Sequence, residues 1–229
     1  MSTAENFRAV LAEIEDARKR KAVATDEEII LVAVTKNHGV ELMREAIDAG
    51  AKNIGENRVQ EAAEKFQTLD RKVTRHLIGH LQTNKVKQAV KLFDLIQSVD
   101  SSHLAAALDK AAAQIDKIQD VLIQVNLARE PQKSGVTLEN LKSLISLVDS
   151  SKNLRLRGLM MIAPNFPDVE ECRPLFRQMR KLFDELKTSR ENFDFLSMGM
   201  THDYKIAIQE GANVVRLGTA IFGERSLNA

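Results

Sequence analysis

Residues 29–36 read Ile-Ile-Leu-Val-Ala-Val-Thr-Lys, a run of six apolar residues that leads into a threonine and a lysine. A continuous apolar run of this kind is typical of a parallel strand that is buried on both faces. An amphipathic stretch follows over Val40–Ala49, with its apolar residues at helical spacing. The two stretches predict a strand followed by a helix, which is the repeating unit of α/β proteins.

The same unit recurs along the whole chain. The sequence predicts eight strands, at Ile29–Lys36, Asn53–Glu56, His76–His80, Leu95–Val99, Val121–Asn126, Leu156–Ile162, Phe193–Met198 and Val214–Leu217. It predicts helices at Val40–Ala49, Arg58–Leu69, Lys85–Leu92, Ser102–Gln114, Leu138–Val148, Val169–Leu186 and Asp203–Glu210, and an extra N-terminal helix at about Glu5–Lys19. Eight such units close into a (β/α)8 barrel of the TIM type, usually about 250 residues long. The alternative, an open doubly wound sheet, lacks its G-x-G-x-x-G after the first strand. We therefore expect residues 1–229 to form a single barrel domain.

The composition excludes several other classes of protein. The chain has 229 residues and a net charge of +1, which offers no basic surface for nucleic acid, and no segment is long enough to span a bilayer. Cys172 is the one cysteine, so no internal disulfide can form, and the first residues lack the apolar core of a signal peptide. We expect a cytoplasmic monomer, with Cys172 as ordinary packing inside a helix. The histidines have no metal-ligand spacing, so no metal site is expected.

The lysine at the end of the first strand is the first candidate for chemistry. In a (β/α)8 barrel the functional residues lie at the C-terminal ends of the strands and in the loops that follow. Lys36 stands at such an end, where apolar walls favour the neutral amine that Schiff-base chemistry requires. The alternative is a lysine that leaves the strand and extends into solvent. Lys133, after the fifth strand, is expected to be solvated in this way.

The segments after the last two strands predict a phosphate site. Loops at this position form the usual phosphate site of these barrels, and glycine lets backbone N–H groups approach the anion. The candidate residues are Ser197, Met198, Gly199, Gly218 and Thr219. A purely structural interpretation stays open, with Thr201 as a helix N-cap, Asp203 as a first-turn acid and Gly218 in a tight turn.

Three more polar residues stand at predicted strand ends. Arg216, on the last strand, needs a polar ligand or a carboxylate, because a buried arginine without a partner would be very costly. Asn57 follows the second strand, where it could equally form a capping box with Gln60. His80 follows the third strand, and a single histidine there is a weak indication of a site.

These residues suit a ligand with an aldehyde at one end and a phosphate at the other. Pyridoxal 5′-phosphate (PLP) is such a molecule. Two other functions stay open at this point. A single-domain PLP-dependent amino-acid racemase would exchange the α-proton of its substrate with solvent. A Schiff-base aldolase would form a covalent adduct with a sugar phosphate.

Six motifs in order along the chain resemble the pyridoxal phosphate homeostasis protein family, which is related to the N-terminal barrel domain of alanine racemase. They are VAVTK (32–36), IGENRVQE (54–61), HLIGHLQTNK (76–85), GLMMIAP (158–164), LSMGMTHDYKIAI (196–208) and VVRLGTAIFG (214–223). The sequence departs from the family pattern at Thr201, where serine is frequent, and at Met161, where smaller or polar residues are common.

The resemblance implies a role for each candidate residue. Lys36 would hold PLP as an internal aldimine, and Arg216 would contact the pyridine nitrogen. The implied phosphate ligands are Ser197, Gly218 and Thr219 with nearby backbone amides, and Asn57 is implied beside the cofactor. Met198, Gly199 and His80 complete the set of residues that we expect to bind the cofactor.

The resemblance also implies a carrier with no catalytic residues. A cation at the ring nitrogen opposes its protonation, which weakens the ring as an electron sink. Racemases of this fold take one base from a second domain, whereas this sequence ends six residues after Gly223. We therefore expect a protein of vitamin B6 homeostasis that binds PLP reversibly, with PLP-dependent apo-enzymes as recipients.

Overall fold

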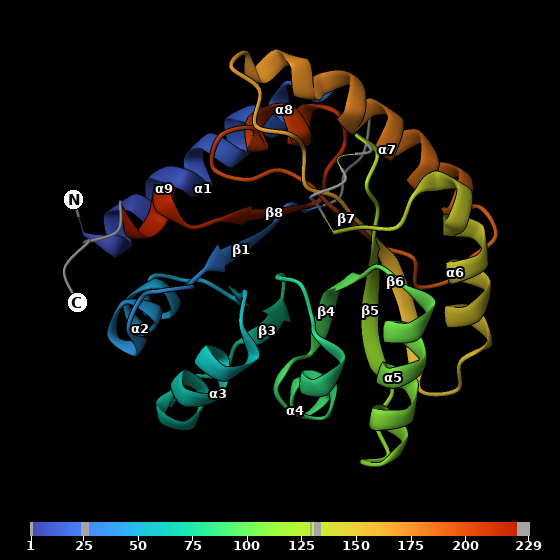
Figure 1. The fold of residues 1–229 in the computed structure, drawn as a ribbon. Helices are drawn as coiled ribbons and strands as arrows, with labels where there is room; N and C mark the ends of the chain where they lie inside the picture. The colour runs from blue at the N-terminus through green and yellow to red at the C-terminus, as the bar shows by residue number, and fades with distance from the viewer. Residues whose placement is uncertain (1, 24–27, 129, 131–133, 224–229) are drawn as a thin grey trace.

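The computed structural model describes residues 2–23, 28–128, 130 and 134–223, and within these ranges eight strands form one closed barrel (Figure 1). The strands follow one another around the barrel in chain order, each parallel to the next, and β8 pairs with β1 to close it. They are β1 (Ile30–Val34), β2 (Asn53–Glu56), β3 (Thr74–Leu77), β4 (Leu95–Val99), β5 (Gln119–Gln124), β6 (Leu154–Met160), β7 (Phe195–Ser197) and β8 (Val214–Leu217). The expected (β/α)8 architecture is confirmed.

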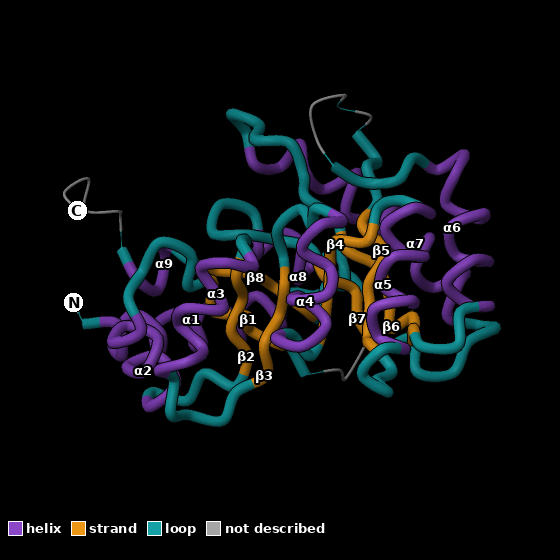
Figure 2. The backbone as a smooth tube through the Cα atoms, turned by 60° about the horizontal axis from the view of Figure 1, so that its bottom comes forward, coloured by secondary structure: helices purple, strands orange, loops and turns teal. Residues whose placement is uncertain are grey.

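Helices surround the strands, as Figure 1 and the turned view of Figure 2 show. They are α1 (Thr3–Lys19), α2 (Val40–Asp48), α3 (Val59–Thr68), α4 (Val86–Leu92), α5 (Ser102–Ala113), α6 (Leu138–Ser150), α7 (Arg173–Lys187), α8 (Tyr204–Gln209) and α9 (Thr219–Phe222). Two 3-10 helices, η1 (Thr83–Lys85) and η2 (Val169–Cys172), precede α4 and α7. Among the described helices, none has the length and apolar character needed to cross a membrane.

The third strand ends earlier than expected, at Leu77 rather than at His80. The cause is the close approach of two backbones after the strand. A Cβ on Gly79 would lie 2.3 Å from the carbonyl oxygen of Asn57, so only glycine fits there. The chain therefore leaves the sheet before His80 and passes against the loop that follows β2.

The long helix expected from Val169 to Leu186 is divided into η2 and α7. Pro174 stands in the first turn of α7, where its missing N–H group costs nothing. The short helix α9 was not expected, because four residues are too few to show helical periodicity.

The extra N-terminal helix α1 packs against the elements that carry the last two loops of the barrel. It lies beside α8 and α9, which are far from it in sequence (Figure 1). Asn6 Nδ2 donates to Ile221 O in α9 at 3.0 Å. Glu13 accepts a hydrogen bond from the hydroxyl of Tyr204 and pairs with Lys205 at 2.9 Å, and both of these partners belong to α8. The start of the chain is thereby tied to its last helices.

The interior of the barrel has an unusual polar content. The main apolar cluster lies between the strands and the helices, whereas the separate inner cluster is small, with Leu95, Leu122 and Met160 as its buried members. Four buried polar residues, His76, Gln97, Ser197 and Arg216, come from β3, β4, β7 and β8. Because Ser197 and Gln97 are hydrogen-bonded although β7 and β4 are not neighbours, that contact crosses the barrel interior.

Candidate functional site

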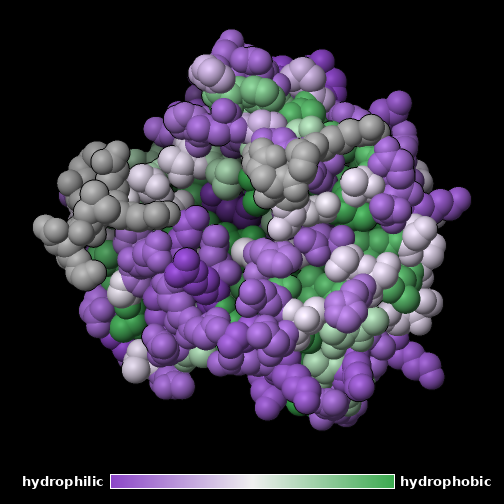
Figure 3. All heavy atoms as spheres, in the orientation of Figure 1, coloured by the Kyte–Doolittle hydropathy of each residue, from purple (hydrophilic) through white to green (hydrophobic). Residues whose placement is uncertain are grey.

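A cavity of about 460 Å³ opens at the C-terminal mouth of the barrel, where the functional residues of such barrels lie. Figure 3 views this mouth and shows the surface hollowed near its centre, with hydrophilic residues inside. The lining residues are Val34, Lys36, His38, Asn57, Ile78, Ile162, Met200, Thr201, His202, Arg216, Gly218, Thr219 and Gly223. The structure therefore brings together five of the residues expected from the sequence, namely Lys36, Asn57, Arg216, Gly218 and Thr219.

Lys36 follows β1 by two residues, and hydrogen bonds hold the backbone on both sides of it. Lys65 Nζ donates to Thr35 O at 2.7 Å, and Asn37 N donates to Glu61 Oε1 at 2.5 Å. Asn37 has a φ of 62°, in the left-handed region that asparagine tolerates better than most residues. The chain thus turns sharply after Lys36 and leaves this side chain at the cavity wall.

A buried acid, Glu56, lies beside this turn at the end of β2. Its Oε1 accepts hydrogen bonds from Thr35 Oγ1 at 2.6 Å and from Lys65 Nζ at 2.8 Å. Burial raises the pKa of Glu56, and the hydrogen bond from Lys65 opposes that rise. Sequence reasoning missed this cluster, because only the packing of α3 beside β2 brings Lys65 to Glu56. An acid at the end of a buried strand was the available signal.

Arg216 is 3% exposed and contributes to the cavity from β8. Its NH1 donates to Ser197 Oγ at 2.5 Å, and its NH2 donates to Met161 O at 2.8 Å. Burial lowers the pKa of Arg216 to about 10, and the negative charge of Asp203 opposes that shift. At neutral pH the side chain is still a cation, and its remaining N–H groups can serve a ligand.

Asn57 lines the cavity and does not cap a helix. The N-cap residue of α3 is Arg58, and no side chain caps that helix, so the expected capping box of Asn57 and Gln60 is wrong. Asn57 Oδ1 is buried and has no hydrogen-bond partner among the described residues. Because an unsatisfied buried acceptor costs about 1–3 kcal/mol, a donor from a bound ligand would stabilise this position.

Ser197, which the sequence predicts as a phosphate ligand, is not among the residues that line the cavity. The side chain is fully buried in β7, where its hydroxyl donates to Gln97 Oε1 at 2.6 Å and accepts from Arg216. The hydroxyl proton is therefore donated to Gln97, and the oxygen already accepts a hydrogen bond from Arg216. Thr201, four residues later, presents the hydroxyl that lines the cavity from this loop.

The other loop residues expected at the phosphate have structural roles. Met198 is fully buried in the core. Gly199 has a φ of 97°, and a Cβ there would lie 2.7 Å from the Cβ of Ala207 in α8. Asp203 is the N-cap residue of α8 and accepts from Met200 N at 2.6 Å, so Thr201 is not the N-cap. These contacts shape the loop that carries Thr201.

Gly218 and Thr219 lie together at the cavity, where β8 leads into α9. Gly218 is the N-cap residue of α9 and passes close to β1, since a Cβ there would lie 3.2 Å from Val34 O. Thr219 adds a hydroxyl at the first position of the helix, where backbone N–H groups have no partner within the helix. Gly223 also lines the cavity. This segment thus has the donors that an anion requires.

His80 lies outside the cavity, in a neighbouring hollow that also contains Arg58 and Lys85. Its ring is largely exposed, with Nδ1 3.6 Å from Asp100 Oδ2, and the candidate residue Asn57 lines this hollow together with it. Lys133 lies outside the described residues.

Cys172 is buried, as expected for a packed side chain, with its sulfur 3.7 Å from Pro164 O. No group of three or more His, Cys, Asp or Glu side chains within the described ranges could hold a metal ion.

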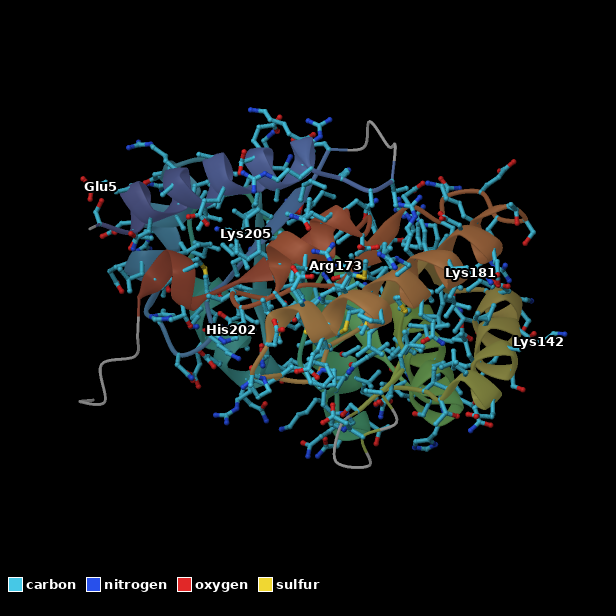
Figure 4. The ribbon with its side chains drawn as sticks, turned by 90° about the horizontal axis from the view of Figure 1, so that it is seen from above. Glu5, Lys142, Arg173, Lys181, His202 and Lys205 are labelled. Carbon is cyan, nitrogen blue, oxygen red and sulfur yellow. The ribbon has the colours of Figure 1, made fainter. Side chains whose placement is uncertain are left out.

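Sequence reasoning missed the other eight lining residues, and four of them follow strands of the structure closely. His38 follows β1 and stacks on Phe222 of α9, with ring centroids 5.0 Å apart. Thr201 and His202 follow β7, and His202 lies on the loop before α8 (Figure 4). Ile162 follows β6 and adds apolar surface. Their position just after the ends of strands indicated that they could line the cavity. Nothing in the sequence alone, however, distinguishes them from the neighbouring loop residues that do not line it.

The cavity combines a primary amine, a buried cation, two hydroxyls, helix N–H groups and an unsatisfied amide oxygen. These groups fit a flat ligand that carries an aldehyde, an anion and a ring acceptor, and the volume is within the range of small-ligand sites. They therefore fit pyridoxal 5′-phosphate.

The family model of the alanine racemase N-terminal domain matches residues 9–226. The chain belongs to this family. Among its relatives, a protein of Aquifex aeolicus (strain VF5) is 42% identical over 227 residues, covering 98% of this chain and 99% of the relative. A protein of Escherichia coli (strain K12) is 42% identical, covering 94% of this chain and 95% of the relative. Both are named pyridoxal phosphate homeostasis protein.

Solved structures of this family have the same architecture. PipY of Synechococcus elongatus PCC7942, with PLP bound, is 35% identical with a TM-score of 0.85, covering 97% of this chain and 100% of that chain. Alanine racemase of Clostridium difficile 630 is 16% identical with a TM-score of 0.74, covering 98% of this chain and 58% of that chain. At that identity the racemase shares the fold alone.

Proposed function

We propose that this chain binds PLP reversibly at the cavity and acts as a non-catalytic carrier in vitamin B6 homeostasis. The observation that carries the proposal is that Lys36, Asn57, Arg216 and Thr219 line one cavity of about 460 Å³. The names of the relatives and the PLP in the PipY structure support it. When bound, PLP supplies an aldehyde that condenses with a primary amine and releases one water.

The residues of the chain have separate roles in this proposal. Lys36 supplies the amine, and Arg216 donates to the ring nitrogen. Thr201 and Thr219 bind the phosphate, together with backbone N–H groups beside Gly218. Asn57 Oδ1 supplies an acceptor for a ligand hydroxyl.

The role of Arg216 favours a carrier over a racemase. Because an arginine cannot accept a proton at neutral pH, it opposes protonation of the ring nitrogen and so weakens the ring as an electron sink. We further propose that the chain works as a cytoplasmic monomer of a single domain and passes PLP to apo-enzymes. Size-exclusion chromatography with light scattering would test whether the protein is a monomer. Incubation with alanine in deuterium oxide would test for catalysis, because a racemase would exchange the α-proton of alanine with solvent.

The decisive experiment compares wild type, Lys36→Ala and a control, Lys87→Ala, whose lysine is exposed on α4. We expect added PLP to give wild type and the control the visible absorbance of a lysine adduct. Borohydride reduction and peptide mass spectrometry should then identify Lys36 as the modified residue. A wild-type spectrum that does not respond to PLP would overturn the proposal, and reduction onto another lysine would overturn the assignment of Lys36.

A further inference from the structure

A chain of hydrogen bonds runs from the cavity through the barrel to its opposite mouth. Arg216 donates to Ser197, Ser197 donates to Gln97, and Gln97 contacts His76 Nδ1 at 2.9 Å. His76 Nε2 lies 3.1 Å from Asn53 Oδ1. Arg216 lines the cavity at the C-terminal mouth, whereas His76 and Asn53 line a hollow of about 210 Å³ among the first residues of the strands.

The direction of every hydrogen bond in this chain follows from the guanidinium. Arginine can only donate, so Ser197 Oγ must accept from Arg216 and must give its own proton to Gln97 Oε1. The amide of Gln97 is thereby oriented, with its NH2 group directed at His76 Nδ1. His76 Nδ1 must then be an acceptor, and the ring proton lies on Nε2, where it is donated to Asn53. Burial lowers the pKa of His76 to about 4, in agreement with a neutral ring.

The chain also fixes the position of Arg216. Of the two hydrogen bonds that its side chain donates within the described part of the protein, one goes to the backbone of Met161 and the other to Ser197. Ser197 and Gln97 are both inaccessible to solvent, so water cannot replace either partner without a cavity being opened. The orientation of the guanidinium toward the ligand thus depends on two residues that do not line the ligand cavity.

We propose that Ser197 and Gln97 are positioning residues, which hold the Arg216 guanidinium so that it donates to the ring nitrogen of bound PLP. This inference rests on the proposed function. It assigns Ser197 a role in recognition of the ring in place of the phosphate contact expected from the sequence. The inference also predicts that substitution of either residue weakens the binding of a ligand only if that ligand has a ring nitrogen.

The test measures the dissociation constants of PLP and of its 1-deaza analogue, in which a carbon atom replaces the ring nitrogen. Ser197→Ala removes the acceptor of Arg216, and Gln97→Met removes the acceptor of Ser197 at similar side-chain length. The matched control is Ser98→Ala, because the Ser98 hydroxyl is buried on the same strand as Gln97 without a hydrogen-bond partner in the described residues. Thermal unfolding of each variant, without ligand, shows that it folds.

We expect Ser197→Ala to weaken PLP binding about tenfold, Gln97→Met to weaken it about threefold, and Ser98→Ala to leave it unchanged. All variants should bind the deaza analogue as wild type does. Equal weakening of both ligands, or PLP binding at wild-type strength in both chain variants, would overturn the inference. If Ser197→Ala does not fold, the comparison of the two ligands in Gln97→Met decides it. If wild type binds neither ligand, the proposed function itself has failed.

Discussion

Arg216 lies on β8, and Lys36 follows β1, the strand that pairs with β8 to close the sheet; Arg216 is in register with Val32, four residues before Lys36. Closure of the barrel thus brings a residue from near the end of the chain beside one from near its start. The one supplies a buried cation and the other an amine, and both line the same cavity.

The two threonines of the cavity, Thr201 and Thr219, should distinguish PLP from pyridoxal, which carries an alcohol in place of the phosphate. We expect Thr201→Ala and Thr219→Ala each to weaken PLP binding about tenfold, because a hydrogen bond to a charged group contributes about 1.5–3 kcal/mol. Binding of pyridoxal, which lacks the phosphate, should not change. Titration calorimetry with both ligands measures this, with Thr83→Ala on the surface as control. Equal losses for the two ligands would contradict a phosphate contact.

Gly79 should not tolerate a side chain. Its Cβ would lie 2.3 Å from Asn57 O, a backbone atom that cannot move without the loop that carries Asn57. We expect Gly79→Ala to lower the free energy of unfolding by about 1–3 kcal/mol and to weaken PLP binding. In the control Gly39→Ala the new Cβ meets only the flexible end of Glu41, so the loss should be smaller, about 0.5–1 kcal/mol from the N-cap position of α2. Urea denaturation checks both, and equal stability of the two variants would refute the argument.

His76 should make the protein less stable in acid. Burial lowers its pKa to about 4 in the folded state, against an ordinary value of 6.5. Between these values the unfolded chain binds a proton that the folded chain does not, so stability falls as the pH drops through 6.5 and levels off below 4. The loss should reach about 2 kcal/mol at pH 5. This loss should be absent in His76→Gln, and urea denaturation of both proteins at pH 7 and pH 5 would measure it. The same pH dependence in wild type and variant would contradict the role of His76.

Tyr204 is the one tyrosine of the sequence, and there is no tryptophan, so its ionisation can be followed by ultraviolet absorbance. Burial and its hydrogen bond to Glu13 raise the pKa of Tyr204. We expect tyrosinate to appear well above pH 10 in the folded protein, and at lower pH in Glu13→Gln. Lys205→Ala should leave the titration nearly unchanged, since its pair with Glu13 is half exposed. A wild-type titration near pH 10 would mean that α1 does not hold this contact.

The order of strands and helices could be predicted from the sequence, because apolar runs and helical periodicity are local properties. The positions of Lys36 and Arg216 at the barrel mouth followed from the same pattern, since parallel strands place their C-terminal ends at one edge. The boundaries after β3 and before α7 could not be predicted, because they depend on the contact between Gly79 and Asn57 and on where Pro174 falls in the turn.

The direction of the Ser197 side chain could not be predicted from the local sequence. The order of the strands and the composition of the last loops were enough to predict that a hydroxyl, a glycine loop and an arginine would meet near the end of the barrel. In the folded protein the Ser197 hydroxyl is directed inward to Arg216 and Gln97, while Thr201 lines the cavity. The physical reason is that Gln97 lies 100 residues away along the chain and on a strand across the barrel. Hydrogen bonds between strands that are not neighbours exist only after closure, and no periodicity in the sequence records them.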